Sequence, residues 1–302
     1  MRIGLTTSVI QRGRTGIAQW VFAMVRALQP FSADHDFVLF VLEEDLPLFD
    51  FAAASMELVP VSETYRSPVR DLFWHQVMLP GLARRHQLDV IHVPSYRRLP
   101  WASPCKRVGT IHDLAPFRLS GKYDWKRMLF GRVVVPFLAR RQHRLVAVSQ
   151  FTAADIHTFL GIDPAQVSVI LNGVDHARFC PEPAPVSGAG RAEDPSPDAP
   201  YLLYVARLEH PAKNHLRLIR AFSAYKERTG SPCKLVLAGS DWDGADVIHE
   251  AIAASPVRED IRCLGFVPDA DLPQLYRQAQ AFLFPSLFEG FGMPPIEAMA
   301  CG

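Results

Sequence analysis

The sequence predicts an α/β protein with two parallel-sheet domains. Short apolar runs that are typical of buried strands alternate with helical patterns along the chain, and this alternation implies parallel sheets. The composition changes between Cys180 and Pro200, where Pro, Gly, Ser, Ala and acidic residues replace the periodic patterns. We therefore predict a first domain at 1–180, a linker at 181–200 and a second domain at 201–302.

The composition is that of a soluble globular protein. Of the 302 residues, 49% are hydrophobic and 21% are charged. No apolar run reaches the roughly 18–20 residues that span a membrane, and the first residues suit a strand better than a signal peptide. The five cysteines are scattered without metal or redox spacing, which predicts reduced thiols and a cytoplasmic location.

The charge is unevenly distributed. The chain has a net charge of +1, which argues against nucleic acid as a partner, yet residues 81–150 hold 14 Lys and Arg against three Asp and Glu. This asymmetry points to an anionic partner for one face. The alternative is a solvated basic face with its counter-charges elsewhere in the fold.

The first strand, predicted at 2–10, is followed by a loop that contains Gly13 and Gly16. Glycine at this place lets the backbone approach a ligand closely, although a plain turn is the alternative. The two glycines do not form G-x-G-x-x-G, and no suitable acid follows the second strand, so we disfavour a dinucleotide site. A helix is predicted at 19–28.

A polar pair, His112-Asp113, ends another predicted strand of the first domain. Ligands of open α/β sheets bind at the carboxyl ends of strands, so His112 is a candidate functional residue. The other strands of this domain are predicted at 37–42, 58–61, 89–94, 145–149 and 167–171.

Two long helical stretches are predicted, at 72–85 with a break or kink at Pro80 and at 123–144 with a kink at Pro136. The second carries an apolar and a basic face. These faces fit an anionic membrane surface, within the basic segment 81–150. They fit equally an ordinary core face and a solvated face.

In the second domain, two cations follow the first strand. Arg207 comes at the end of the strand and Lys213 near the start of the next helix, where such a pair can hold a pyrophosphate. A surface ion pair is the alternative for Arg207. Gly239 ends another strand in a manner suited to phosphate, and Asp241-Trp-Asp243 matches a D-x-D metal motif, which we attribute to chance. Strands are predicted at 201–206, 234–240, 261–267 and 281–284, and helices at 215–227 and 271–279.

The last turn of the chain carries two carboxylates around a glycine loop. A buried strand at 281–284 leads to Glu289, Gly290 and Gly292, and two prolines then open a helix. We expect Glu297 in the first turn of that helix. An isolated loop charge and a helix-dipole contact are the alternative roles of the two glutamates.

Glu289-x7-Glu297 within EGFGMPPIEAMACG resembles the signature of retaining glycosyltransferases of family 4, which have the GT-B fold. Thr-x-His112-Asp-Leu-x-Pro and Asn172-Gly-Val-Asp175 resemble two further motifs of that family. The resemblance implies two Rossmann-like domains that face a cleft, an acceptor-side one and a nucleotide-sugar-binding one. The Arg207–Lys213 spacing is one residue longer than the commonest form.

The resemblance also implies roles for residues. His112 and Glu289 would act at the sugar, as the catalytic residues. Arg207 and Lys213 would bind the diphosphate, and Glu297 the ribose. Gly16 would line the cleft, and the base would lie near Gly265 and Phe266. The backbone N–H groups of Phe291, Gly292 and Met293 would hold the sugar.

The expected function is transfer of a hexose, with mannose as the first guess, from a nucleotide-diphosphate sugar to a polysaccharide or lipid-linked glycan. The resemblance implies retention of configuration, no metal and no cofactor beyond the donor. A lipid-linked acceptor would place the protein at the inner face of a membrane. The alternatives are a non-catalytic nucleotide-sugar-binding or scaffold protein and a GT-B sugar-nucleotide epimerase. Family members continue past this helix, so we expect the second domain to be truncated, with sheet strands missing.

Overall fold

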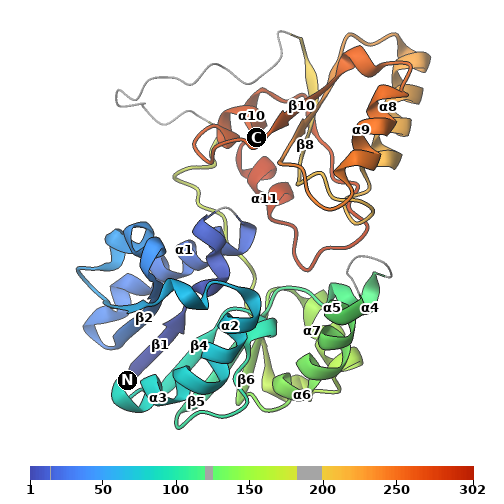
Figure 1. The fold of residues 1–302 in the computed structure, drawn as a ribbon. Helices are drawn as coiled ribbons and strands as arrows, with labels where there is room; N and C mark the ends of the chain where they lie inside the picture. Colours follow the sequence, from blue (N-terminus) through green and yellow to red (C-terminus); the bar gives the residue numbers. More distant parts are fainter. Residues whose placement is uncertain (14, 120–124, 182–198) are drawn as a thin grey trace. The chain divides into compact units, whose positions relative to one another are not determined.

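The computed structural model describes residues 1–13, 15–119, 125–181 and 199–302, without the side chain of Arg127. The chain divides into two compact units, Met1–Asn172 and Gly173–Gly302, each built on its own parallel sheet (Figure 1). The predicted α/β class is confirmed. Most of the predicted linker lies outside the described residues. The second unit begins before residue 180, and Phe179 is buried in its core.

The first unit contains a seven-stranded sheet with the order β3-β2-β1-β4-β5-β6-β7. Each neighbouring pair is parallel, and β1 pairs Leu5 with Leu39 of β2 and with His92 of β4. All the carboxyl ends therefore meet at one edge of the sheet. The strands are β1 (Arg2–Thr6), β2 (Asp36–Leu42), β3 (Glu57–Val61), β4 (Val90–Val93), β5 (Lys106–Ile111), β6 (Arg144–Ala147) and β7 (Val167–Val169).

Helices cover both faces of this sheet. One core joins the sheet to α1 and to the 3-10 segment Glu43–Ala52, while the other joins it to Trp74 of the π turn after α2 and to α3, α6 and α7. Between these two cores β2 is buried along almost its whole length, as is usual for a parallel sheet covered on both faces, whereas the edge strands β3 and β7 are partly exposed. The helices are α1 (Gly16–Leu28), α2 (Pro68–Phe73), α3 (Leu79–Arg85), α4 (Ala115–Arg118), α5 (Trp125–Leu129), α6 (Val135–Ala139) and α7 (Gln150–Leu160).

Three predicted elements of this unit differ from the structure. The first strand ends at Thr6, because Ser8–Gly13 curls into a 3-10 segment with positive φ at Gln11, Arg12 and Gly13. Pro80 does not end its helix: the helical stretch runs from Pro68 to Arg85, with a π turn at Trp74–Met78 shortly before the proline. In the stretch predicted as helical at 123–144, the last helix ends at Ala139, and Arg144 is the first residue of β6. Residues 123 and 124 lie outside the described part.

The second unit contains a four-stranded parallel sheet with the order β10-β9-β8-β11. Its strands are β8 (Tyr201–Val205), β9 (Lys234–Ala238), β10 (Ile261–Gly265) and β11 (Ala281–Phe282), and its helices are α8 (His215–Thr229), α9 (Ala245–Ala253), α10 (Leu272–Gln278) and α11 (Met293–Ala300). The helix α9 was not predicted.

Two predictions for the end of this unit are wrong. The strand predicted to be buried, β11, is half covered, because it lies at the edge of the described sheet and exposes Ala281. Helix α11 begins at Met293, capped by Gly292, so Glu297 lies in its second turn rather than its first. The contact between Glu297 and the helix dipole is correspondingly weaker, since the effect falls off within the first turn.

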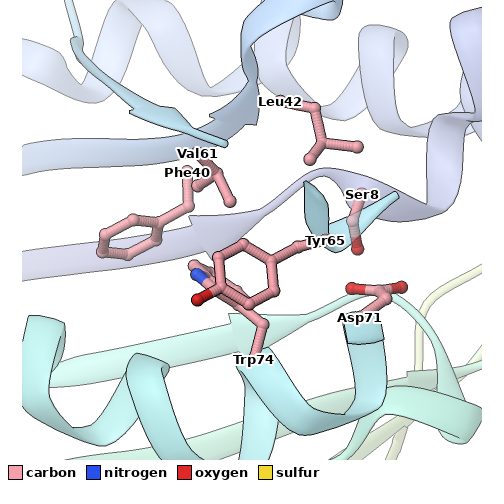
Figure 2. A pocket seen from close by; sticks show the side chains of 7 residues that line it. All are labelled: Ser8, Phe40, Leu42, Val61, Tyr65, Asp71 and Trp74. Carbon is pink, nitrogen blue, oxygen red and sulfur yellow. The ribbon is translucent and has the colours of Figure 1, made fainter. Parts of the chain in front are cut away.

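Two hollows lie among the described residues of the first unit. A cavity of about 10 Å³ lies between Ser8, Phe40, Tyr65, Asp71 and Trp74 (Figure 2). That is room for one water molecule and not for a sugar. A hollow of about 430 Å³ lies at the amino ends of β4 and β5, beside Asp89 and Lys106, away from the strand ends where ligands of such sheets bind.

All five cysteines are free thiols. Within the residues that the structure describes, no helix is both long and apolar enough to cross a membrane.

Candidate donor site

The candidate site of the second unit is built where its strands end. Arg207 follows β8, and Glu289 lies in the loop between β11 and α11. Because β8 and β11 are neighbours in the sheet, their loops emerge side by side. Residues that are 82 positions apart in sequence thus share one edge.

These two loops are joined by hydrogen bonds. Lys213 Nζ lies 2.6 Å from Glu289 Oε1. The side chain of Asn214 donates to the carbonyl of Pro285 at 2.9 Å, and the backbone N–H of Leu287 donates to Ala212 at 3.0 Å. Both loops are therefore held in place without a ligand.

Tyr204 of β8 contacts both of these loops. Its hydroxyl donates to the carbonyl of Lys213 at 2.9 Å and lies 3.0 Å from Ser286 Oγ. A phenol has one proton, so the Ser286 hydroxyl is the donor of the second bond. Burial raises the pKa of Tyr204, which keeps the phenol protonated as this geometry requires.

Arg207 has two neighbours that orient it. Its Nη2 lies 3.2 Å from the buried carboxylate of Glu209, and its guanidinium carbon lies 4.4 Å from the centre of the Trp242 ring. Trp242 was not identified from the sequence. It stands in the D-x-D tripeptide after β9, and of the two acids Asp241 pairs with His249 at 2.9 Å. The sequence feature that could have identified Trp242 is an aromatic residue just after a predicted strand, in the same domain as a candidate cation that also follows a strand.

Glu297 is oriented by a tyrosine of α10. The Tyr276 hydroxyl donates to Glu297 Oε2 at 2.9 Å, which leaves the other carboxylate oxygen for a further partner. Burial raises the pKa of Glu297, against the lowering effect of the Tyr276 hydrogen bond and of Arg178. Tyr276 was also missed, because in the sequence it occupies an ordinary apolar position of a helix.

The glycines of this edge differ in what they do. A Cβ on Gly239 would lie 2.1 Å from the carbonyl oxygen of Ala206, so the close contact between two loops requires this glycine. The phosphate role expected for Gly239 is therefore not needed to explain it. Gly265 and Gly292 have positive φ, and Gly292 caps α11, beside Phe291 and Met293. A Cβ on Gly265 would meet open space.

The remaining candidates lie in the first unit. His112 follows β5, and its Nε2 lies 3.3 Å from the carbonyl of Pro94. A carbonyl only accepts, so Nε2 carries the proton and Nδ1 is an acceptor in the neutral ring. Burial lowers the pKa of His112, opposed by the charge of Asp113, which favours that neutral form.

Trp20 of α1 packs its ring edge-on against His112, with the centroids 4.8 Å apart. It was not identified from the sequence, where it belongs to a helical pattern. Gly16 is the first residue of the same helix, and the hydroxyl of Thr15 caps it by accepting from Ala18 N–H at 3.2 Å. A Cβ on Gly16 would meet nothing within 4 Å, so the fold itself leaves this position free.

The structure therefore brings Lys213 into contact with Glu289 and places Arg207 on the neighbouring strand end. Glu297, Gly265 and the Phe291–Met293 segment belong to the same unit, whereas His112 and Gly16 belong to the other. The roles assigned to all of these residues stay predictions.

Two family models match the chain. Residues 14–178 match the model described as Glycosyltransferase Family 4, and residues 191–302 match the model of glycosyl transferases group 1. Together they account for both units.

Individual proteins are similar over shorter segments. The chain is 41% identical to the O-antigen chain mannosyltransferase B of Escherichia coli over 103 residues, which are 34% of this chain and 26% of that protein. It is 34% identical to the D-inositol 3-phosphate glycosyltransferase of Salinispora tropica over 170 residues, 53% of this chain and 35% of that protein. The matched segments thus span a quarter to about a third of these relatives.

Among solved structures, HepE of Anabaena in complex with UDP-glucose superposes with a TM-score of 0.70 at 20% identity. The match covers 100% of this chain and 78% of that one. At this identity the likeness concerns the fold.

Proposed function

Since the chain belongs to glycosyltransferase family 4, we propose that it transfers a hexosyl group from a nucleotide-diphosphate sugar to a glycan or lipid-linked acceptor. The observation that supports this most directly is the 2.6 Å contact between Lys213 and Glu289. It puts a cation suited to phosphate beside a carboxylate suited to sugar hydroxyls. A donor that contains both groups, joined by one bond, fits this pairing.

In this proposal Arg207 and Lys213 bind the diphosphate. During transfer the bond between the anomeric carbon and the diphosphate oxygen breaks, and a bond to the acceptor oxygen forms. The acceptor's proton passes to the departing diphosphate on the same face, which retains configuration and uses no metal. Two cations that face the diphosphate stabilise the charge that develops on it.

The sugar and the ribose are bound by the carboxylates. Glu289 accepts hydrogen bonds from sugar hydroxyls once it shares Lys213 with the phosphate. The free oxygen of Glu297 accepts from a ribose hydroxyl, while Tyr276 holds the other oxygen. The N–H groups of Phe291, Gly292 and Met293 donate to the sugar, and the base lies near Gly265.

In the first unit, Nδ1 of neutral His112 accepts a hydrogen bond from a sugar hydroxyl. Gly16 allows the substrate to approach the start of α1. His112 and Glu289 are thus the residues that we assign to the sugar itself.

Mannose, carried by GDP, is the donor that we test first, because one similar protein is an O-antigen chain mannosyltransferase. A UDP-sugar is the second choice, because a protein of similar fold was solved with UDP-glucose. A glycan of the O-antigen type is the corresponding acceptor.

A thermal-shift screen of GDP-mannose, UDP-glucose and other nucleotide sugars tests this proposal. We expect one donor to raise the Tm of the wild type, and Arg207→Ala to remove most of that rise without lowering the Tm of the free protein. Transfer of label to an acceptor glycan would follow for the same donor. If no nucleotide sugar raises the Tm, the donor site is wrongly assigned.

The same samples separate the two other functions. Binding of a nucleotide sugar without transfer to any acceptor would favour a non-catalytic binding or scaffold protein. Conversion of the nucleotide sugar into another one without an acceptor would identify an epimerase.

A further inference from the structure

Two helical segments of the first unit expose apolar residues to solvent. They are Pro68–Arg85 (α2, a π turn at Trp74–Met78, and α3) and Trp125–Ala139 (α5, a π turn at Phe130–Val134, and α6). The sequence left open whether the apolar side of the second segment is a core face or a membrane face. The structure contains both, because its apolar residues point in two directions.

In the second segment, Val135 and Leu138 are buried in the core. Trp125, Leu129 and Val133 are 71%, 54% and 58% exposed. In a straight helix with 3.6 residues per turn, side chains four residues apart are offset by a small angle around the helix axis, and the offset accumulates along the helix. The wider π turn opposes this drift, so these side chains, with Phe137 after them, follow one side of the segment.

The first segment repeats this pattern. Val69, Phe73 and Val77 are 80%, 51% and 54% exposed, again four residues apart and again across a π turn. Trp74 and Leu79 of the same segment are buried. Each segment therefore has an apolar side in the core and a second apolar side in solvent.

The two exposed sides belong to one face of the unit. Both segments pack on the same core and both contact the short turn Tyr96–Arg98 between them. Trp101 bridges them: its backbone N–H donates to Gln76 Oε1 at 2.8 Å, and its ring lies 4.5 Å from that of Phe137. We call this surface the apolar-basic face; its apolar members are Val69, Phe73, Val77, Trp101, Trp125, Leu129, Val133 and Phe137.

The charge of this face is positive. Residues 125–154 contain no Asp or Glu. Between 68 and 85 the one carboxylate is Asp71, which is 3% exposed, ion-paired with Arg98 and 3.1 Å from His75 Nδ1. The hydrogen bonds and charges of these two partners outweigh burial and lower the pKa of Asp71. The exposed charges on the two segments are cations, among them Arg70, Arg84, Arg85 and Arg132, and the exposed Arg140 directly follows the second segment.

Arg141 shows how cations and aromatic rings combine here. Its guanidinium carbon lies 4.2 Å from the centre of the Trp101 ring and 4.5 Å from that of Phe137. Of the 21 exposed large hydrophobic residues in the described part of the chain, ten are on these two segments and at Trp101. Such concentration marks a binding surface rather than scattered exposure.

We propose that the apolar-basic face lies on an anionic phospholipid membrane. Aromatic and aliphatic side chains enter the headgroup boundary, and the arginines around them pair with lipid phosphates. A second copy of this chain fits less well. A two-fold dimer would place this face against itself and bring its arginines together.

This inference goes beyond the proposed transfer reaction and needs no sugar donor. If the transfer reaction is as proposed, the face would hold the protein at the bilayer, where a lipid-linked acceptor is found. Failure of the donor site would leave the membrane surface untouched, and the reverse also holds.

Sedimentation with vesicles tests the face. We expect the wild type to sediment with vesicles of 30% phosphatidylglycerol in phosphatidylcholine. It should stay in the supernatant in 0.5 M salt, and also with vesicles of pure phosphatidylcholine. The double variant Trp125→Ser/Leu129→Ser should lower the partition coefficient by about tenfold, and Arg140→Glu/Arg141→Glu by at least about tenfold, given the gain per basic residue near such a surface. Phe31→Ser, exposed to 54% on another element, is the matched control and should sediment like the wild type.

Circular dichroism and Tm establish that each variant is folded. A separate variant in the other segment, Val69→Ser/Phe73→Ser, keeps the test valid if one pair unfolds. Equal sedimentation of the wild type and all folded variants would overturn the proposal. So would a concentration-dependent dimer that these variants dissociate, with no binding to anionic vesicles.

Discussion

Lys213 and Glu289 form an ion pair across two neighbouring strand ends, with Nζ 2.6 Å from Oε1 and both side chains partly buried. Asn214 and Tyr204 hold the backbone on either side of this pair. A ligand diphosphate that recruits Lys213 must therefore share it with Glu289 or replace Glu289. This competition allows the phosphate and sugar contributions to binding to be separated.

We predict opposite effects of Glu289→Gln on two ligands. The change removes a negative charge beside the phosphate site, so a sugar-free nucleoside diphosphate should bind as well as before or a few-fold more tightly. The nucleotide sugar should lose the extra affinity that its sugar provides. Calorimetric titration with GDP and GDP-mannose, or with UDP and UDP-glucose, measures both.

Lys213→Met is the matched change on the other side of the pair. A lost charge-assisted hydrogen bond costs about 1.5–3 kcal/mol, so both ligands should bind at least about tenfold more weakly. If Glu289→Gln also weakened the binding of both ligands by the same factor, the assignment of Lys213 to the phosphate and Glu289 to the sugar would be contradicted.

The contact between Arg207 and Trp242 leads to a second prediction. Trp242→Ala should weaken nucleoside diphosphate binding several-fold, because a cation–π contact at a half-exposed site contributes about 0.5–1 kcal/mol and also orients the guanidinium. Trp242→Phe keeps a ring and should retain most of the affinity. Calorimetric titration with the nucleoside diphosphate compares the affinities of the wild type and both variants.

That prediction assumes that Trp242 affects binding only by positioning Arg207. If Trp242→Ala in an Arg207→Ala background still costs the full factor, the ring contacts the ligand directly. A binding constant unchanged in Trp242→Ala would contradict the assignment.

The sequence was informative wherever a local rule fixes the structure. The alternation of strands and helices predicted both sheets, and strand ends predicted where Arg207, His112 and Glu289 would lie. It was not informative about partners. Tyr276 and Trp20 look like core residues in a helical pattern, and their contacts with Glu297 and His112 depend on tertiary packing.

The boundaries failed for physical reasons as well. Pro80 was expected to interrupt a helix, yet the helical stretch continues through it, with a π turn at Trp74–Met78 shortly before the proline. The register of α11 depends on the cap at Gly292, whose positive φ cannot be read from the proline pair that follows. The first error arises inside a helix whose hydrogen-bond pattern widens, and the second at a turn where one residue decides the start of a helix.

Gly16→Ala separates a structural from a substrate-related glycine. A Cβ at this position meets open space and the helix gains a better helix former, so Tm should stay equal or rise slightly. If the substrate approaches the start of α1, transfer should nevertheless fall at least about tenfold, as expected for a small misplacement of substrate.

The comparison is Gly239→Ala, whose Cβ would collide with Ala206. That variant should lose more than about 2 kcal/mol of unfolding free energy. Unchanged transfer in Gly16→Ala would remove Gly16 from the site.

His215 predicts how stability depends on pH. It is 1% exposed, neither ring nitrogen has a hydrogen-bond partner among the described residues, and its ring packs on Tyr204. Burial, followed by the charge of Lys213, lowers the pKa of His215 to about 4. In the unfolded chain a histidine titrates near 6.5. Between these values the unfolded state binds a proton that the native state does not, so the free energy of unfolding falls as the pH decreases.

The loss due to His215 is at most about 3 kcal/mol and is complete near pH 4. His215→Phe keeps the aromatic packing and removes the titration. Differential scanning calorimetry of both proteins from pH 7.5 to 4.5 should show a smaller decrease in Tm for the variant. His176→Phe, at an exposed histidine, should follow the wild type. Parallel Tm curves for His215→Phe and the wild type would mean that His215 gains a partner or reaches solvent. In that case the packing between Tyr204 and the Lys213 loop would be looser than the hydrogen bonds indicate.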